Sequence, residues 1–441
     1  MEGTMSANWS INVDWETLDK GPPEERACFA ALGIQAHGVW LTEGRDALAN
    51  RLRNAPLLSA YSLAEWMAWN WWRLRWEPRS SARDWVYAHR LTTIGGGYIW
   101  PNITVFSDGE RIALIAKPTS ERPQTPFRYI ANVAAVIQAS EFEVEVDNFI
   151  DQTLQRLDGE RIGDTNLAAI WKGVLEERRT PELTYARKLE ALLSQEPDEA
   201  DPRTIAQLIK DAAALSMAAI EEIAADRSPG QSVPTADELK EIADKKGFDA
   251  SPRDRARLAP GHGTPKIGQV PAWRMGTDVA RALRDQERLD GKPISNALLA
   301  KLAGTHVVAL NERSSGASIS FALDSDVQHS RVVLRSKWES GRRFELARLL
   351  GDRLAGPKGG RLFPATRAYT YRQKMQRSFA AEFLAPFDAV DEMLSGDYSM
   401  ENQLEVASHF NVSELTVRTL LLNHGRLDRE ESFDEFEAVN A

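Results

Sequence analysis

Apolar residues recur every three or four positions along much of this chain, the spacing that places them on one face of an α-helix. In the C-terminal part this pattern predicts helices at Trp273–Leu289, Arg343–Leu354, Tyr371–Leu384, Met400–Phe410 and Ser413–Asn423. Gly356, Pro386 and Gly425 follow three of these segments at the positions where helix-ending residues are expected.

The N-terminal part carries similar helical patterns. Ser62–Trp76 is predicted to be one helix, because Ser62 followed by Glu65 is the signature of a capping box. The periodicity also predicts two helices within Phe127–Leu157 and one helix at Thr204–Ala225.

Short apolar runs bounded by turn residues predict strands. Ile103–Phe106 and Arg111–Ala116 flank a Ser-Asp-Gly turn and predict a β-hairpin. Further strands are predicted at His306–Leu310, Ser318–Leu323 and Arg331–Leu334, with a turn at 314–316 joining the first two. The fold class expected is therefore α+β and mostly helical.

Tryptophan is unevenly distributed, and this suggests separate domains. Ten of the thirteen tryptophans lie in the first hundred residues. We expect a Trp-rich α+β domain at 1–158, a helical region with linkers at 159–265, a C-terminal domain with a short sheet at 266–430, and an acidic tail at 431–441.

Composition excludes several classes of protein. The 441 residues carry a net charge of −10, which excludes a uniformly basic nucleic-acid binder but not a local basic patch. The single cysteine, Cys28, can form no intrachain disulfide. No apolar run is long enough for a membrane span and no signal peptide is visible, so the expectation is a cytoplasmic protein without a membrane partner.

Two separated motifs of the C-terminal part resemble the ImmA/IrrE family of zinc metallopeptidases. Phe379–Pro386 reads FAAEFLAP and is similar to the family element ANxFAAELLxP. Asn411-Val412-Ser413, followed by Val417, is similar to the later segment F-x-VS-x-x-x-V. The resemblance covers Trp273 to Leu427, about a third of the chain, and implies a zincin-like domain there.

The same resemblance implies that the catalytic motif has been lost. The family sequence R-F-T-L-A-H-E-x-G-H corresponds to Arg343–Asp352, which reads RFELARLLGD. Arg348 and Asp352 then stand where the two zinc histidines are expected, and Leu349 where the general base is expected. Gln373 stands at the position of the third ligand, a glutamate.

These replacements remove the chemistry of a zinc peptidase. A guanidinium has no lone pair to donate to a metal, and leucine cannot take a proton from water. We therefore expect no metal and no cofactor. An ion pair between Arg348 and Asp352, with Gln373 hydrogen-bonded nearby, is one interpretation of the vacated positions; two unpaired, solvated side chains are the other.

The segment from 331 to 377 is strongly basic. It holds thirteen Lys or Arg against three acids, a net of +10, whereas the residues from 378 onward carry about −11. One hypothesis is a partner-binding surface made by Lys337, Arg342, Arg343, Arg372, Lys374 and Arg377. The other is that the basic segment packs against the acidic C-terminal segment of the same chain.

Residues 404–422 resemble a helix-turn-helix, with Ser413, Thr416 and Arg418 as candidates for DNA contact.

The function favoured is a non-catalytic ImmA/IrrE-like regulatory protein of a bacterial stress, mobile-element, defence or toxin–antitoxin system. Its partner would be a protein, such as a helix-turn-helix repressor or a toxin. The alternatives are a metallopeptidase with unrecognised zinc ligands and a DNA-binding transcriptional regulator.

Overall fold

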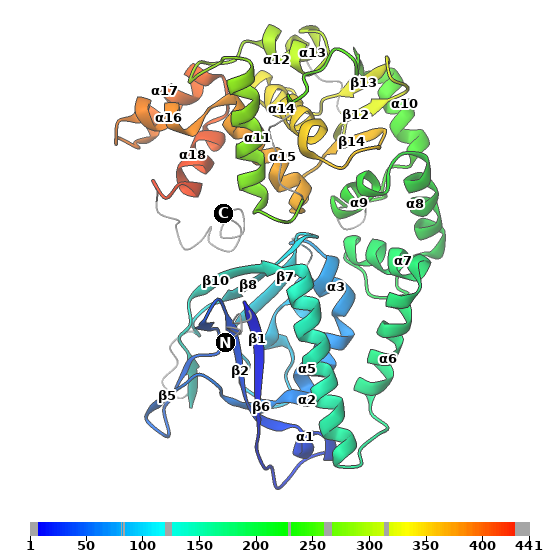
Figure 1. Cartoon of the computed structure of the whole chain (residues 1–441), viewed down its shortest axis with the longest axis vertical. Coiled ribbons are helices and arrows are strands. Elements are labelled where there is room, and N and C mark those ends of the chain that lie inside the picture. Colours follow the sequence, from blue (N-terminus) through cyan, green and yellow to red (C-terminus); the bar gives the residue numbers. More distant parts are fainter. Residues whose placement is uncertain are drawn as a thin grey trace, which may run out of the picture. The chain divides into compact units, whose positions relative to one another are not determined.

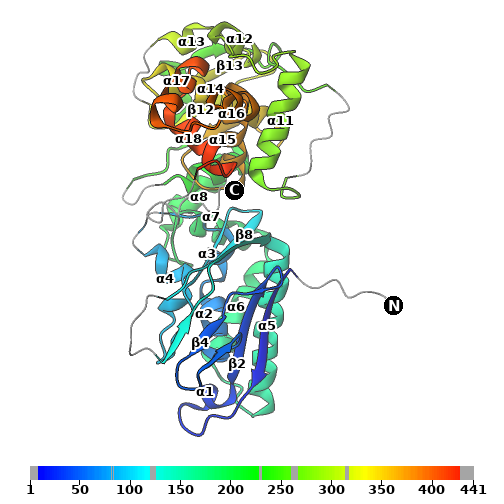
Figure 2. The same ribbon diagram turned by 90° about the vertical axis from the view of Figure 1, so that its left-hand side faces the viewer.

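The computed structural model describes residues 8–80, 82, 84–119, 126–227, 231–259, 267–312 and 317–427. It divides into two compact units, Met1–Ile205 and Ala206–Ala441, which are described separately (Figures 1 and 2). Helices account for 49% and strands for 16%, which confirms the α+β, mostly helical class. The expected acidic tail at 431–441 and the turn at 314–316 lie outside the described residues.

The first unit contains three small antiparallel sheets. The first has the order β1-β2-β3 with β6 also paired to β2, the second β10-β8-β7 and the third β5-β4-β9. Their strands are β1 (Trp9–Trp15), β2 (Phe29–Ala36), β3 (Val39–Trp40), β4 (Gly44–Asp46), β5 (Arg51–Arg53), β6 (Leu57–Ser59), β7 (Ile103–Ser107), β8 (Arg111–Ala116), β9 (Phe127–Tyr129) and β10 (Val133–Gln138).

Helices of the first unit pack on these sheets around one apolar core. They are α1 (Pro23–Ala27), α2 (Ala60–Trp69), α3 (Trp71–Trp76), α4 (Trp85–His89), the 3-10 turn η1 (Leu91–Thr93), α5 (Ala139–Gly159), α6 (Asn166–Arg179) and α7 (Pro181–Leu192). On α5, Phe142 packs against Trp9 of β1 with ring centroids 6.0 Å apart. Trp72 donates from Nε1 to Glu177 of α6 over 2.7 Å, so this unit extends beyond residue 158.

Two predictions for the first unit are wrong in detail. The single helix expected at Ser62–Trp76 is two helices, broken at Asn70, and the N-cap of the first is Ser59 rather than Ser62. Residues 127–138, expected to be helical, form β9 and β10, because β4 and β8 offer them strand partners. A short apolar run fits either period, and long-range pairing decides between them. The predicted β7–β8 hairpin is confirmed.

The second unit has one four-stranded antiparallel sheet, in the order β11-β13-β12-β14, surrounded by helices. The strands are β11 (Phe248–Ala250), β12 (Ser320–Asp324), β13 (Ser330–Val333) and β14 (Leu362–Ala365). The helices are α9 (Met217–Ala225), α10 (Ala236–Lys246), α11 (Ala272–Gln286), α12 (Asn296–Leu302), α13 (Val308–Asn311), α14 (Glu339–Ala355), α15 (Tyr371–Leu384), α16 (Phe387–Leu394), α17 (Met400–Phe410) and α18 (Glu414–Asn423). Helix α8 (Pro202–Ala214) spans the division between the units.

Helices α11, α14 and α15 form the centre of the second unit, and two glycines let them approach closely. A Cβ at Gly276 of α11 would lie 2.4 Å from the carbonyl oxygen of Met375, and one at Gly351 of α14 would lie 2.5 Å from the ring of Phe379. Such distances exclude a side chain at either position without a shift of α15. This packing fixes the separation of α14 and α15.

Helix predictions for the C-terminal part are largely confirmed, and those at Tyr371–Leu384 and Met400–Phe410 have the observed ends. The strand expected at His306–Leu310 is wrong, because residues 308–311 form the one-turn helix α13. The helix expected at Thr204–Ala225 is broken, because Ser216 has extended backbone and separates α8 from α9. In the described part of the chain, no helix has both the length and the apolarity needed to cross a membrane.

Candidate functional site

The positions at which the resemblance expects metal ligands lie where α14 and α15 pack together. Arg348 of α14 donates from Nη2 to Oε1 of Gln373 on α15 over 2.5 Å, and to the carbonyl oxygen of Thr366 over 2.6 Å. Arg348 is 7% exposed and Gln373 is fully buried. The expected proximity of these two side chains is therefore confirmed, and both are hydrogen-bonded.

Asp352 has a different partner from the one expected. Arg372, the neighbour of Gln373 on α15, donates to the two carboxylate oxygens of Asp352 over 2.7 and 2.6 Å. The first interpretation, an Arg348–Asp352 ion pair, is therefore wrong, because Arg372 binds both oxygens of Asp352 while Arg348 donates from Nη2 to Thr366 and Gln373. The second interpretation, two solvated side chains, is also wrong, because Arg348 and Asp352 are both buried. Two-point pairing of this kind is the strongest geometry available to arginine and carboxylate.

A second carboxylate reaches this region from α9. Thr370 donates from Oγ1 to Oε2 of Glu222 over 2.5 Å, and Arg372 also donates to the carbonyl oxygen of Ala218 over 3.0 Å. Burial raises the pKa of Glu222 to about 7, although Arg372 nearby acts in the opposite direction. We call Glu222, Arg348, Asp352, Thr370, Arg372 and Gln373 the Glu222 cluster.

The Glu222 cluster brings two carboxylates, Glu222 and Asp352, close to the guanidinium of Arg372. The described residues contain no group of three or more His, Cys, Asp or Glu side chains that could bind an ion. Leu349, at the position expected for a general base, is 2% exposed and belongs to the apolar core. What the cluster does is join α9, α14 and α15 through buried charged and polar groups.

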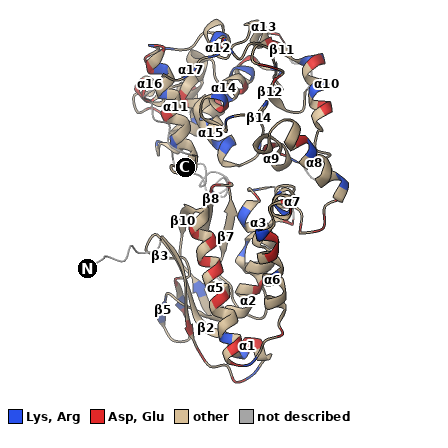
Figure 3. Cartoon of the chain, turned by 45° about the vertical axis from the view of Figure 1, so that its right-hand side comes forward, with Lys and Arg blue, Asp and Glu red and all other residues tan. Residues whose placement is uncertain are grey.

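Most of the cations proposed as a partner surface are buried. Figure 3 marks the Lys and Arg positions in blue on the ribbon, among them those on α14 and α15. Arg342 and Arg343 are each 1% exposed. Arg342 donates from Nε to the carbonyl oxygen of Ala309 over 3.0 Å. Arg343 donates to the carbonyl oxygens of Asn411 and Ile294 over 3.0 and 2.7 Å. Neither guanidinium is available to a partner in this conformation.

The remaining members of that proposed surface differ in exposure. Arg372 is held by Asp352, and Lys374 is 8% exposed. Arg377 is half-buried and donates to the carbonyl oxygen of Ala368 over 3.0 Å, whereas Lys337 is exposed. The basic segment does contact the C-terminal segment, but at Phe410 and Asn411 it binds backbone carbonyls rather than carboxylates.

Two of the three candidate DNA-contacting residues, Ser413 and Thr416, form the N-terminal cap of helix α18. Ser413 is its N-cap and accepts from the backbone N–H of Thr416, while Thr416 is 8% exposed. Arg418 is half-buried. A recognition helix presents such side chains to base edges, and of these three only Ser413 is exposed.

Sequence reasoning missed a cavity of about 410 Å³ formed by α11, α14, α15 and α18. We call it the α18 cavity. Its lining residues are Trp273, Thr277, Ser340, Gly341, Phe344, Lys374, Arg377, Ser378, Ala381, Ser413, Leu415, Thr416, Thr419, Leu420, Asn423 and His424. Its volume is in the range of sites that bind small ligands or single side chains of a partner. Its exposed apolar lining residues, Trp273 and Leu415, are 142 residues apart in the chain, so no local sequence pattern indicates the cavity.

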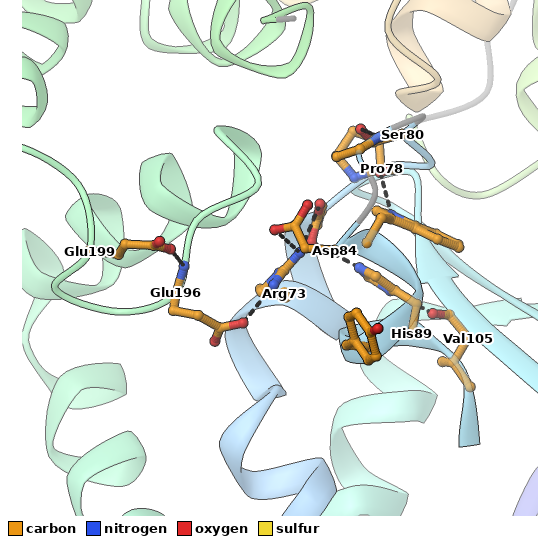
Figure 4. Close-up of polar contacts among 12 residues, drawn as sticks. Arg73, Pro78, Ser80, Asp84, His89, Val105, Glu196 and Glu199 are labelled. Carbon is orange, nitrogen blue, oxygen red and sulfur yellow. Dashed lines mark hydrogen bonds and ion pairs between the residues drawn. The ribbon is translucent and has the colours of Figure 1, made fainter. Parts of the chain in front are cut away.

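Sequence reasoning also missed a buried charged cluster in the first unit (Figure 4). His89 of α4 donates from Nδ1 to the carbonyl oxygen of Val105 over 2.7 Å, and its Nε2 lies 2.9 Å from Oε2 of Glu77. Arg73 of α3 donates to the same Glu77 oxygen over 2.7 Å, and to Glu196 over 2.5 Å. We call Arg73, Glu77, His89, Val105 and Glu196 the Glu77 cluster.

The partners of Glu77 determine its protonation. Burial raises the pKa of this carboxyl, but His89 and Arg73 together outweigh burial and hold the pKa below its ordinary value. A carbonyl oxygen can only accept, so His89 must carry a proton on Nδ1. Glu77 and His89 are both 0% exposed, so a substrate cannot reach either side chain in this conformation, whereas the Glu196 side chain at the edge of the cluster is 34% exposed.

Known proteins offer no direct guide to the role of either cluster or of the cavity. Comparison with family models, with curated proteins and with solved structures found no match to this chain.

Proposed function

We propose that the second unit is a non-catalytic, peptidase-like binding module of a regulatory protein. The observation that carries this proposal is the convergence of Arg348, Asp352 and Gln373, which the resemblance puts at three metal-ligand positions. They come from α14 and α15, and all three side chains are buried where these two helices pack together. Asp352 is paired with Arg372 and Gln373 is hydrogen-bonded, whereas the buried Nε of Arg348 has no hydrogen-bond partner among the described residues.

Loss of the metal removes the chemistry without removing the scaffold. Arginine, leucine and glutamine at these positions can neither bind zinc nor activate water, whereas the sheet and the helices around them keep a packed core. A domain of this kind acts by binding. The resemblance implies a bacterial stress, mobile-element, defence or toxin–antitoxin setting and a protein partner such as a helix-turn-helix repressor or a toxin.

The first test is the metal content of the purified chain. We expect no stoichiometric zinc and no change in melting temperature when EDTA is added, because a bound structural metal contributes folding energy. One equivalent of zinc per chain, or a fall of several degrees with EDTA, would favour the metallopeptidase with unrecognised ligands.

The second test restores the ligands. Arg348→His, Leu349→Glu, Asp352→His and Gln373→Glu together place two imidazoles four residues apart on α14, opposite a carboxylate on α15. We expect zinc uptake near 1:1, measured by titration calorimetry. The same variant with Gln373 retained is the matched control and should bind zinc at least tenfold more weakly. If the full variant keeps its circular dichroism and melting cooperativity yet binds no zinc, the assignment of these positions is wrong.

A further inference from the structure

We propose that the α18 cavity is a binding site for an acidic peptide segment bearing phenylalanine, and that its occupant is residues 428–441 of the same chain. This inference goes beyond the proposed function, since it requires only the cavity and this segment. A peptidase-like domain with another role would have the same site.

The cavity wall is apolar where a side chain would enter. Trp273 and Phe344 line it together with Leu415 and Leu420. Trp273 is 37% exposed and Leu415 is 68% exposed, although both lie beside a space large enough to hold an aromatic ring. Covering such residues removes apolar surface from water and is favourable by roughly 25 cal/mol per Å².

The charge of the lining has one sign. Lys374 and Arg377 of α15 contribute cations, and none of the described residues that line the cavity is acidic. The described hydrogen bond of the Arg377 guanidinium goes to the neutral carbonyl of Ala368, which leaves its charge in place. An apolar cavity with cations beside it favours an occupant that joins an apolar group to carboxylates.

Residues 428–441 have this chemistry. The segment reads DREESFDEFEAVNA, with six acids, one arginine, and phenylalanines at 433 and 436. It follows Leu427 directly, and His424, three residues earlier, lines the cavity. Six extended residues span up to about 20 Å, enough to bring Phe433 to the cavity. Covalent attachment also gives the segment an effective concentration of about the millimolar range.

The test uses a chain ending at Leu427 and a fluorescein-labelled synthetic peptide of residues 428–441. Fluorescence anisotropy should show binding to the shortened chain that weakens with salt, since the attraction between charges is screened. The full chain should bind the peptide at least tenfold more weakly, because its own segment competes. A peptide with Phe433→Ala and Phe436→Ala should lose at least tenfold in affinity.

A matched pair of protein variants locates the site. Leu415→Glu adds an acid to the cavity rim, whereas Leu404→Glu adds one to α17 at a similarly exposed leucine that does not line the cavity. In the shortened chain the first should weaken peptide binding at least tenfold, and the second should leave it within twofold of the unchanged sequence. Both leucines are exposed, so neither substitution should disturb folding.

Several outcomes overturn the inference. Absence of peptide binding to the shortened chain removes the site, and equal binding to both chain lengths shows that the segment does not occupy it. If the shortened chain with Leu415→Glu binds the peptide as tightly as the unchanged sequence, the peptide does not bind in the α18 cavity. A concentration-dependent dimer of the full chain that disappears on shortening assigns the occupant to a second copy instead.

Discussion

Each unit buries a glutamate within a charged cluster, and the two carboxylates respond to burial in opposite directions. Glu77 is 0% exposed and Glu222 is 7% exposed, so solvent access does not distinguish them. Glu77 lies between the imidazole of His89 and the guanidinium of Arg73, and its pKa is lowered. Glu222 is hydrogen-bonded by the neutral side chains of Thr370 and Gln373, and burial raises its pKa to about 7.

The difference shows that the pKa of a buried carboxyl depends on whether a nearby cation donates hydrogen bonds to it, and less on the cation simply being close. Arg372 lies close to Glu222, but its guanidinium makes both of its charged hydrogen bonds to Asp352. In the first unit, Arg73 and His89 direct hydrogen bonds at Glu77 itself. A buried carboxylate is held ionised by donors aimed at it, and burial dominates where they are aimed elsewhere.

The largest loss of stability should come from breaking the buried ion pair between Arg372 and Asp352. Arg372→Met leaves Asp352 buried without its cation and should destabilise this unit by about 3–5 kcal/mol. Urea unfolding, followed by hydrogen exchange of peptides from α14 and α15, measures the loss. The double variant with Asp352→Leu should recover most of it, because a matched apolar pair leaves no charge behind. A single-variant loss below about 1 kcal/mol would contradict the pairing.

The pH response of the second unit tests the raised pKa of Glu222. Between its ordinary value of 4.5 and about 7, the unfolded chain loses this proton while the folded chain keeps it. Stability is therefore greatest below the lower value and falls as pH rises through this window, by up to about 3 kcal/mol at 1.36 kcal/mol per pH unit. Glu222→Gln should flatten the profile; an unchanged slope in that variant would assign the dependence to another group.

The first unit should respond with the opposite sign. Because the folded pKa of Glu77 lies below its ordinary value of 4.5, its contribution is complete at higher pH and is lost as pH falls through the folded value. Hydrogen exchange of peptides from α3 and α4 in acid follows this loss. Glu77→Gln should remove it, and a first unit that gains stability in acid would reverse the comparison.

The smallest effect is expected outside both clusters. Lys337 is exposed and lies five residues before the fully enclosed Arg342. Lys337→Glu should change stability by less than about 0.5 kcal/mol, measured by thermal melting. A change of several kcal/mol would show that Lys337 contacts a structural partner within the chain. The basic segment 331–377 would then be part of the protein interior at Lys337 as well as at Arg342.

Sequence predicted the parts of the fold that local patterns determine. Tyr371–Leu384 and Met400–Phe410 have their expected ends because apolar periodicity marks both helices, and Pro386 follows the first. Val133–Gln138 was not predictable as a strand, because its sequence VAAVIQ fits a buried helix until β8 supplies a partner. One-turn elements such as α13 carry too few residues for any period.

The candidate site was predictable only in part, for a similar reason. The family resemblance placed Arg348 near Gln373, and the structure joins them. It gave no indication of Glu222, which lies 148 residues from its donor Thr370 in the chain. It also did not predict that Arg372 binds Asp352. Arg372 and Gln373 are adjacent on α15, and helical periodicity does not show which of two adjacent side chains will contact a given residue of α14.

The hydrogen bonds and the ion pair of the Glu222 cluster also constrain the routes by which this sequence can change. Any single substitution of Arg348, Asp352, Arg372 or Gln373 leaves a buried donor, acceptor or charge without its partner, at a cost of at least about 1–3 kcal/mol. Marginally stable proteins tolerate few such steps. Neutral drift at these positions therefore requires paired changes, and a gradual path toward a metal-binding set crosses intermediates that selection against unfolded protein removes.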